Sequence, residues 1–532
     1  MSSEAQEARF AVNVYLLRDG IGAPTSVLDF SGLNDSISVL IGPDNTVAQL
    51  YYGRTSGPPD WLVRLFQMSH GSPELPKGAS ISGVLPIPVN GRHFILTFGH
   101  AWQKIKPKLI EPNFGIRCVL NLAETNSLRG IRRDRIAEDT LQAIEQIPDS
   151  DDISRFGMDL EKDLLRGVKA KVDPALGYGR WVAGGDSFKT SLDLSKETFV
   201  GFLARCLDLY SAQTYKSRFE WVDNIVPLRD SGLIEKLEYK LAELVGSKSL
   251  TIAMSAPALL SWDDHDYFSF EKKKNGQSPC ANYLDIGQWV EHAALKGITI
   301  NSDALLKEKI YAFRQGEQSF ECWPLIQCIH AVVSLDDRLF LAHAGFWFEL
   351  SKSFVAEIEK RVGEIPISKV VLPSTTITEK EGDYNARAAL DSAGALLLLD
   401  KRLIWHGGGY SRFELCDLFS QDGQLICVKP WGGASGSLSH LFFQAKNAIT
   451  LINKDYEFVP KVRDYIAKID TNFVDIWDYV CKYPNEAEVV LAVIRGCKKE
   501  SLPFFAKLAL CDCVTDLRSM RFTATYLVIN VI

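Results

Sequence analysis

The segment FELCDLFSQDGQLICVKPWGG, residues 413–433, contains the pattern on which the fold assignment depends. Two short runs rich in apolar residues flank a Gln-Asp-Gly turn, an arrangement typical of a β-hairpin. Asp417 interrupts the first run and Lys429 the second, although neighbours such as Leu415 and Leu425 favour a buried sheet. A buried charge without a partner costs several kcal/mol, so each of these side chains needs a partner or a catalytic purpose.

The order of elements around this hairpin favours a mixed sheet with helices on its faces. The hydrophobic pattern predicts, in chain order, a helix at 379–395, strands at 396–405, 411–419 and 424–429, a helix at 436–452, a further helical stretch, a strand at 486–496, a helix at 502–520 and a strand at 522–532. The last strand–helix–strand unit needs a crossover connection. The sequence therefore predicts an α/β fold class for this part, and α+β for the chain overall.

Strand alternation predicts which side chains meet. Asp417 shares a face with Leu415 and Phe419, and Lys429 shares a face with Cys427 on the paired strand, so the hairpin brings the two charges together. Glu414 is expected on the opposite face from Asp417. Two interpretations stay open, which are a buried ion pair between Asp417 and Lys429 or a functional site.

Polar side chains on the flanking helices extend this constellation. Glu379 and Glu381 stand at the start of the preceding helix. His440 and Gln444 are four residues apart on the following helix and so share a face. Carboxylate oxygens suit a hard cation such as Mg²⁺, whereas a lysine neutralises negative charge on a phosphate.

This arrangement resembles the PD-(D/E)XK nuclease superfamily, whose core has the element order αβββαβ. The resemblance implies a nuclease in which Glu381, Asp417, Lys429 and Gln444 are the catalytic residues. It implies Mg²⁺, or Mn²⁺, bound by Asp417 and Glu381, with Glu414 as a further candidate ligand, and a nucleic acid, DNA or RNA, as substrate.

One position departs from the superfamily pattern. The acid that precedes the lysine by two residues is replaced by Cys427, a poor ligand for Mg²⁺. The sequence therefore leaves two functions open. One is a metal-dependent nuclease, and the other is a catalytically degenerate nuclease-fold protein that acts as a binding or regulatory component.

A second resemblance covers nearly the full length. The segments GFLARCLDLYSAQTYKSRFEWVDNIVPLRDSGLIEKL (201–237), YNARAAL (384–390) and CVKPWGGASGSLSHLFFQA (427–445) are similar to a sporadically distributed family of unknown function found in bacterial defence islands. This resemblance implies a bacterial cytoplasmic protein in anti-phage or mobile-element defence, with a phage or defence-system protein as a partner. It supplies no reaction.

Length and composition set the outer bounds. A chain of 532 residues exceeds one ordinary core, and we predict an N-terminal mixed α/β region (1–135), a largely helical middle region (136–375) and a nuclease-like domain (376–532). The net charge of −7 excludes a global basic field, so a nucleic acid must be held by a local patch. No apolar run approaches the ~18 residues of a membrane span, and no membrane partner is expected.

The N-terminal pattern is less distinctive. Strands are predicted at 9–17, 37–42, 93–99 and 114–122, and a mainly helical pattern follows from about 138 to 250. Between them, NSLRGIRRDR (126–135) gathers arginines, of which Arg129, Arg132 and Arg133 are candidates for phosphate contact. A solvated helix start, offset by nearby acids, is the favoured interpretation of this segment.

Other motifs exclude several enzyme classes. There is no Walker A sequence and no Gly-x-Ser-x-Gly nucleophile elbow, which excludes a P-loop NTPase and an esterase of that type. Eleven cysteines without a CxxC pair favour reduced core thiols, and Cys511 and Cys513 are expected on a helix rather than around zinc. The helix predicted at 436–452 offers Ser437 near its start, and His440, as candidate phosphate contacts.

Overall fold

The computed structural model describes residues 10–57, 78–136, 141–192, 196–249, 252–257, 267–272, 280–313, 319–401, 404–406, 411–431, 435–494 and 498–532. The chain divides into two compact units. The first comprises Met1–Arg135 and Leu141–Asp223, and the second comprises Ile136–Thr140 and Asn224–Ile532. The boundary expected at residue 135 coincides with the end of the first segment of the first unit, and the strands up to residue 192 also belong to that unit.

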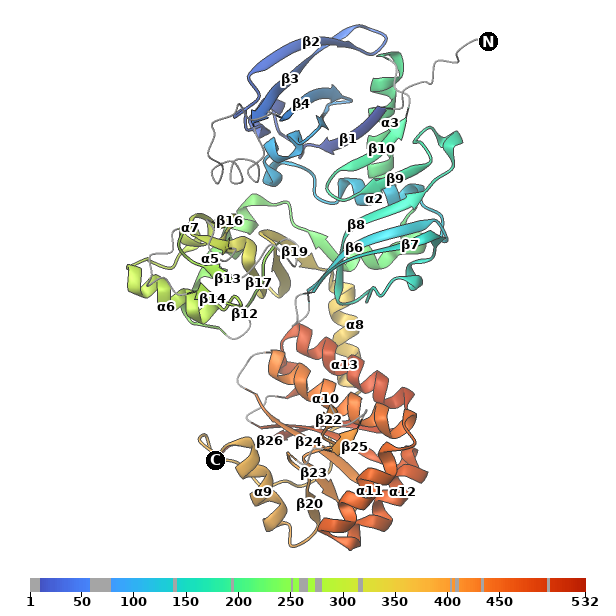
Figure 1. Cartoon of the computed structure of the whole chain (residues 1–532), viewed down its shortest axis with the longest axis vertical. Helices are drawn as coiled ribbons and strands as arrows, with labels where there is room; N and C mark the ends of the chain where they lie inside the picture. Colours follow the sequence, from blue (N-terminus) through green and yellow to red (C-terminus); the bar gives the residue numbers. More distant parts are fainter. Residues whose placement is uncertain are drawn as a thin grey trace, which may run out of the picture. The chain divides into compact units, whose positions relative to one another are not determined.

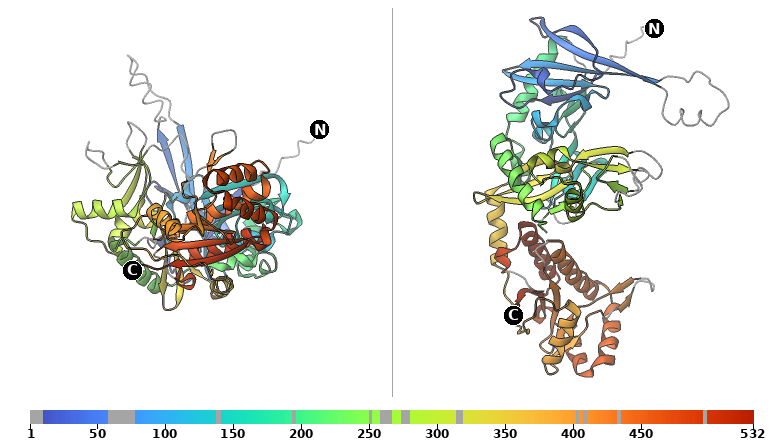
Figure 2. Two further views of the ribbon diagram at one scale, coloured as in Figure 1. Left: turned by 90° about the horizontal axis from the view of Figure 1, so that it is seen from below. Right: turned by 90° about the vertical axis from the view of Figure 1, so that its left-hand side faces the viewer.

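A ten-stranded antiparallel sheet forms the first unit, in the order β2-β3-β4-β5-β1-β10-β9-β8-β6-β7 (Figure 1). Its strands are β1 (Phe10–Leu16), β2 (Asp35–Ile41), β3 (Thr46–Gly57), β4 (Gly78–Val89), β5 (Arg92–Phe98), β6 (Leu128–Arg135), β7 (Gln142–Asp151), β8 (Asp163–Lys171), β9 (Trp181–Gly184) and β10 (Phe188–Leu192). Figure 2 shows β3 and β4 running side by side as a long antiparallel ribbon. The strands predicted around 9–17, 37–42 and 93–99 are confirmed as β1, β2 and β5.

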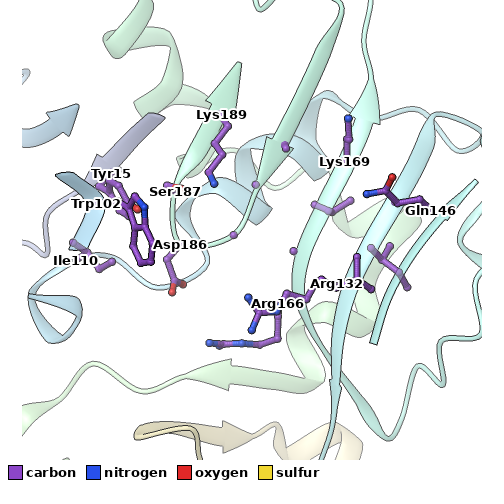
Figure 3. A pocket seen from close by; sticks show the side chains of 18 of the residues that line it. Tyr15, Trp102, Ile110, Arg132, Gln146, Arg166, Lys169, Asp186, Ser187 and Lys189 are labelled. Carbon is purple, nitrogen blue, oxygen red and sulfur yellow. The ribbon is translucent and has the colours of Figure 1, made fainter. Parts of the chain in front are cut away.

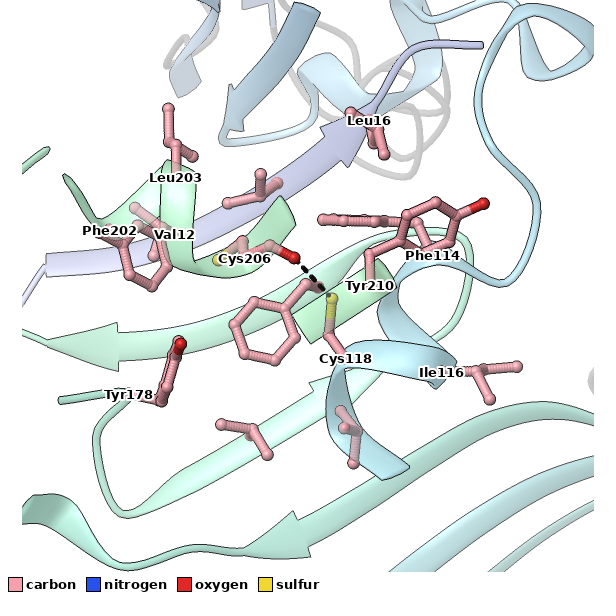
Figure 4. Packing of buried hydrophobic residues seen from close by; sticks show 14 of the residues in the cluster. Val12, Leu16, Phe114, Ile116, Cys118, Tyr178, Phe202, Leu203, Cys206 and Tyr210 are labelled. Atoms are coloured by element: carbon pink, nitrogen blue, oxygen red, sulfur yellow. Dashed lines mark hydrogen bonds between the residues drawn. The ribbon is translucent and has the colours of Figure 1, made fainter. Parts of the chain in front are cut away.

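Two helices cover one face of this sheet, α2 (Phe114–Leu122) and α3 (Lys196–Ser211). Val12, Val14 and Leu16 of β1 point into the same core as Phe202 and Leu203 of α3. Figure 4 shows this packing, in which the thiol of α2 Cys118 donates to a backbone carbonyl of α3. The other face of β1 carries Asn13 and Tyr15.

The strand predicted at 114–122 is wrong, because this segment is α2. Apolar residues fall at every second position from Phe114 to Leu122, with Gly115, Arg117 and Asn121 between them, so the segment satisfies strand alternation as well as helical spacing. A Cβ on Gly115 would lie 1.9 Å from the carbonyl oxygen of Ser187, and one on Gly184 would lie 2.0 Å from the carbonyl oxygen of Gly115. Glycine at both positions therefore permits the helix to press directly against the sheet.

The helical pattern predicted from residue 138 and the helix start predicted at 126–135 are also wrong over β6 to β10. Charged residues inside these strands interrupt the alternation of apolar and polar residues from which strands are predicted. Arg133 is buried in β6, where it pairs with Asp163 and, at 2.8 Å, with Glu145. The helical prediction is confirmed further on, by α3 and by α5 (Ser231–Gly246).

The second unit begins with two small antiparallel sheets and the helices α5, α6 and α7. One sheet has the order β11-β19-β18-β17-β12 and the other β14-β13-β15-β16. Their elements are β11 (Ile225–Pro227), β12 (Ile252–Met254), β13 (Tyr267–Ser269), β14 (Cys280–Ala281), α6 (Ile286–Lys296), α7 (Ser302–Lys307), β15 (Lys309–Phe313), β16 (Ser319–Pro324), β17 (Ile329–Leu335), β18 (Arg338–His343) and β19 (Phe346–Leu350). The largely helical character predicted for 136–375 does not describe this part, which is mixed.

The last part of the chain forms a mixed five-stranded sheet, in the order β20-β23-β24-β25-β26. Its strands are β20 (Leu396–Leu398), β23 (Leu418–Ser420), β24 (Gln424–Pro430), β25 (Glu488–Ile494) and β26 (Thr523–Ile529). β20, β23 and β24 form an antiparallel meander, whereas β24, β25 and β26 are parallel. The predicted α/β class and mixed sheet are confirmed.

Helices cover both faces of this sheet. Tyr384 and Ala388 of α9 (Glu381–Asp391) pack on Leu418, Ile426 and Val428. On the opposite face Phe419 contacts Phe473 and Trp477. The helices after β24 are α10 (Ser435–Lys454), α11 (Phe458–Ile469), α12 (Val474–Lys482) and α13 (Phe504–Ser519), and α8 (Lys352–Gly363) packs against α13 (Figure 1).

Two predicted strands are interrupted. The run 396–405 divides into β20 and β21 (Ile404–His406), and the run 411–419 divides into β22 (Ser411–Phe413) and β23. β21 and β22 pair with each other outside the main sheet. Asp400 and Glu414 both lie in the irregular backbone at these breaks, which frees them from strand alternation.

A candidate metal centre of three carboxylates

Asp417 immediately precedes β23 and is almost fully buried, with 2% of its surface exposed. Its backbone N–H donates to the carbonyl of Ile426, and its Oδ2 accepts from the N–H of Val428 at 2.6 Å. Burial raises the pKa of Asp417 well above its ordinary value, more than the hydrogen bond from Val428 lowers it, and the nearby carboxylates of Glu414, Glu381 and Asp400 add to the rise. A buried carboxylate among other carboxylates favours either a proton or a cation.

Asp417 is joined by two further acids. One carboxylate oxygen each from Glu381, Asp400 and Asp417 lie within 4.8 Å of one another. Glu381 begins α9, Asp400 follows β20 and Asp417 precedes β23, so three separate elements converge. Within the described residues, this is the one group of three acidic, histidine or cysteine side chains whose ligand atoms lie close enough together to hold a metal ion.

Lys429 completes the cluster from the end of β24. Its ammonium lies 3.0 Å from both carboxylate oxygens of Glu381. Both side chains are about one-quarter exposed, at 26% each, so the pair stands at the mouth of the site rather than in its floor. The ion pair that Lys429 makes is thus with Glu381, and Asp417 bonds instead to the backbone beside Lys429.

Glu414 and Gln444 form an adjoining pair. The Gln444 amide on α10 donates to Oε2 of Glu414 at 3.0 Å, and the backbone N–H of Lys401 donates to Oε1. Burial raises the pKa of Glu414, and the nearby charges of Asp400 and Glu381 act in the same direction. The expectation that Glu414 turns away from Asp417 is wrong, because its backbone is not part of a strand.

The donor set fits a hard divalent cation. Three carboxylates offer the oxygen ligands that Mg²⁺ and Mn²⁺ prefer, and their charges exceed the two positive charges of Lys429 and of Lys401, whose ammonium lies 4.0 Å from Oδ2 of Asp400. A Cβ on Gly382 would lie 2.7 Å from the Lys401 ammonium and 3.0 Å from Oδ2 of Asp400, so glycine leaves room for both groups. These features agree on a cation site bounded by α9, β20 and β23.

Cys427 contributes no ligand to this group. It is buried with Cys416 and Cys513 nearby, and burial raises the pKa of its thiol well above the ordinary value. Asp400 supplies the third carboxylate instead, from a different element. Sequence reasoning missed Asp400 because it lay inside the run LLLLDKRLIW, interpreted as one strand; the Asp-Lys pair after four leucines was the available signal for a turn.

The remaining candidate residues lie elsewhere. Glu379 pairs with Arg387 on α9 and not with the cluster. His440 is exposed on α10, and Ser437 belongs to the first turn of that helix. Arg129, Arg132 and Arg133 belong to β6 in the first unit, where Arg129 stacks on Trp181 at 4.9 Å and Arg133 is internally paired. Cys511 and Cys513 are buried on α13, which confirms their helical placement.

The fold and the cluster together define an α/β protein with a candidate centre for a hard divalent cation. The chain belongs to a family of unknown function, DUF6119, whose model matches residues 12–530. No curated protein and no solved structure matches the chain. Within the described residues, none of the helices combines the length and the apolar character that crossing a bilayer requires.

Proposed function

We propose that this protein is a metal-dependent nuclease that hydrolyses phosphodiester bonds of DNA or RNA, in bacterial defence against phages or mobile elements. The single observation that carries the proposal is the convergence of Glu381, Asp400 and Asp417 beside Lys429. Four side chains, spread over 48 residues between Glu381 and Lys429, meet at the end of the mixed sheet where β20 and β24 finish and β23 begins.

The three carboxylates would hold the cation. When bound, Mg²⁺ or Mn²⁺ would polarise a phosphodiester and lower the pKa of a water. Asp417 is fixed by the Val428 N–H and by its place in the sheet, so its free oxygen is pre-oriented toward the other two acids. Glu381 stands nearer the solvent than Asp400 and Asp417.

Lys429 would contact an incoming phosphate. Its ammonium is part-exposed and, among the described residues, is fixed by Glu381, which leaves further donors for a phosphate oxygen or for the attacking water. The hydrogen bond from Gln444 holds the carboxylate of Glu414, which is a further acceptor near Asp400. These positions agree with the roles that the PD-(D/E)XK resemblance implies for Glu381, Asp417, Lys429 and Gln444.

The alternative function is a degenerate nuclease-fold protein that binds without cutting. The observation that favours it is Cys427 at the place of an acid, buried and without ligand character. Asp400 counts against it, because the third carboxylate is present on another element. The two functions differ in one respect that can be measured, since only the nuclease cuts a strand when the cation is bound.

Cleavage of labelled single- and double-stranded DNA and RNA in Mg²⁺ or Mn²⁺ tests the proposal. We expect cutting by the wild type, a loss of at least 100-fold in Lys429→Ala and Asp400→Asn, and none in EDTA. Lys461→Ala is the matched control, since this exposed lysine on α11 pairs only across one helix turn with Glu457. Cutting that survives in Lys429→Ala and Asp400→Asn overturns the assignment. Metal binding without cutting on any substrate favours the degenerate alternative.

A further inference from the structure

A separate hollow lies on the face of the first unit's sheet opposite to α2 and α3 (Figure 3). It has a volume of about 470 Å³, within the range of small-molecule sites, and its lining comes from β1, β6, β7, β8, β9, β10 and the segment 102–110. The helices α2 and α3 cover the opposite face. This hollow shares no residue with the carboxylate cluster.

Small residues make its floor. In the sheet register Lys189 pairs with Ala183, Ala183 with Lys169, Lys169 with Gly130, and Gly130 with Gln146. Ala183 and Gly130 therefore leave bare backbone between longer side chains. Gly167 on β8 extends the bare area, and Gly184 and Gly185 line the hollow with backbone at the turn from β9 to β10. A flat floor between raised side chains accommodates a planar or extended ligand.

The two ends of the hollow differ in chemistry. Tyr15 and Trp102 lie together at one end, with Asp186 and Ser187 beside them (Figure 3). Trp102 is 51% exposed, so its ring is available for stacking. Arg132, Arg166 and Lys169 lie toward the other end, and Lys189 projects between the two. Tyr15 on β1 and Lys169 on β8 are three strand spacings apart, or about 14 Å.

The charge balance of the lining is positive. Four cations face two acids, Glu145 and Asp186, and both acids already have partners. Glu145 accepts from Arg133 and from the Gly157 N–H, and Asp186 accepts from the Asn113 N–H. Arg166 is held by Asp134 at 3.4 Å, which fixes its direction. Among the described residues, no carboxylate pairs with Lys169, Lys189 or Arg132, so an anionic group at the cationic end would replace water there.

We infer that this hollow is a nucleotide-binding site, which takes a nucleoside phosphate either as a free nucleotide or as a unit of a single strand. A nucleotide has an aromatic, hydrogen-bonding base at one end and a phosphate at the other, and the hollow has the complementary polarity. The base stacks on Trp102 and Tyr15 while Asp186 and Ser187 meet its polar edge. Arg132, Lys169 and Lys189 receive the phosphates. The inference does not depend on nuclease activity.

Calorimetric titration of the full chain in EDTA tests the site, because no strand is cut under these conditions. The probes are each of the four ribonucleoside triphosphates, a 12-nucleotide single strand of mixed sequence, and inorganic tripolyphosphate. The variants are Trp102→Ala, Lys169→Ala and Arg132→Ala. Arg155→Ala is the matched control, an exposed arginine of the same unit that pairs with Asp151 away from the hollow.

We expect a triphosphate or the strand to bind, with affinity at least tenfold lower in each of the three variants and unchanged in Arg155→Ala. Binding of triphosphates alone identifies a free nucleotide as the ligand, and binding of the strand alone identifies a nucleic acid. Tripolyphosphate that binds as tightly as the nucleotides, with Trp102→Ala unaffected, overturns the inference. So does the absence of binding by every nucleotide and by the strand.

Discussion

The ammonium of Lys429 lies 3.0 Å from the carboxylate of Glu381, although Lys429 ends a strand and Glu381 begins a helix 48 residues earlier. The pair places a positive charge at the mouth of a site whose floor contains Asp400 and Asp417. A lysine in this position has two possible roles. It balances the carboxylates when no cation is bound, or it contacts the phosphate of a substrate.

Replacing Lys429 separates these roles. In Lys429→Met, removal of a positive charge beside the carboxylates leaves the affinity for Mn²⁺ unchanged or increases it several-fold, because like charges no longer repel. Hydrolysis falls at least 100-fold in the same variant. Metal titration and cleavage on one preparation measure both effects. A loss of Mn²⁺ affinity together with a loss of folded structure would instead mark Lys429 as structural.

The buried carboxylate of Asp417 gives the metal-free protein a specific pH dependence. Its pKa is raised by burial above the ordinary value of 3.8, so the folded state holds this proton more tightly than the unfolded state. The contribution of Asp417 to stability is therefore most favourable below pH 4 and is lost as the pH rises toward the folded pKa. Asp417→Asn keeps an oxygen for the Val428 N–H and carries no charge.

We therefore expect Asp417→Asn to stabilise the metal-free protein at pH 7 by about 1–3 kcal/mol and to have little effect near pH 4. Urea unfolding in EDTA at the two pH values measures the difference. Saturating Mn²⁺ should stabilise the wild type and not the variant. An Asp417→Asn protein that is less stable than the wild type at pH 7 would show that the charged form is favoured by contacts other than a cation.

Substitution of Gly382 tests whether crowding beside Asp400 weakens metal binding. An added methyl group would lie 2.7 Å from the Lys401 ammonium and 3.0 Å from the Asp400 carboxylate, so Gly382→Ala should displace both groups and weaken Mn²⁺ binding at least fivefold. Alanine is the better helix former, so stability should change by less than ~1 kcal/mol. Gly363→Ala is the matched control, because nothing lies within 4 Å of an added Cβ at the end of α8. Equal Mn²⁺ affinity in both variants would place the cation away from Asp400.

The ion pair between Glu379 and Arg387, outside the carboxylate cluster, should make stability depend on pH. Its carboxylate accepts two hydrogen bonds of 2.8 Å from Arg387 and one from Thr375, and chiefly the Arg387 bonds lower its pKa to about 2. A depressed pKa means that this stabilisation is present above about pH 4.5 and is lost as the pH falls toward 2. Glu379→Gln should cost about 1 kcal/mol at pH 7 and less at pH 3.

Urea unfolding at both pH values measures the Glu379 contribution. The control is Glu457→Gln, which removes an exposed carboxylate paired across one turn of α11 and should cost less at pH 7. A Glu379→Gln penalty that is the same at pH 3 as at pH 7 would mean that packing, and not charge, accounts for the contact.

Much of the last sheet was predictable because each strand is a dense apolar run bounded by turn residues. The hairpin at Ser420–Gly423 was predicted, and β24, β25, β26, α10 and α13 were expected from their periodicity. The placement of Asp417 and Lys429 among buried residues was itself the signal for a site. Glu381, Lys429 and Asp417 meet where the element order indicated.

What the sequence could not reveal was the local backbone. The run 411–419 resembles one strand, yet it breaks at Glu414, so alternation assigned that side chain to the wrong face. Asp400 was hidden in the same way by an apolar run that turns at Lys401, whose φ is +57°. In the first unit, α2 resembles a strand in sequence because its apolar residues also fall at every second position. In each of these segments, contacts with residues distant in the sequence determine the backbone conformation.

The measurement that tests the central claim most directly is calorimetric titration of Mn²⁺ into the metal-free protein. The wild type should bind a divalent cation, and Asp400→Asn and Asp417→Asn should each weaken that binding at least tenfold. Asp422→Asn, at the exposed hairpin turn, should leave it unchanged. Equal Mn²⁺ affinity in the wild type and in both cluster variants would contradict the account, since the three carboxylates would then not form a metal centre.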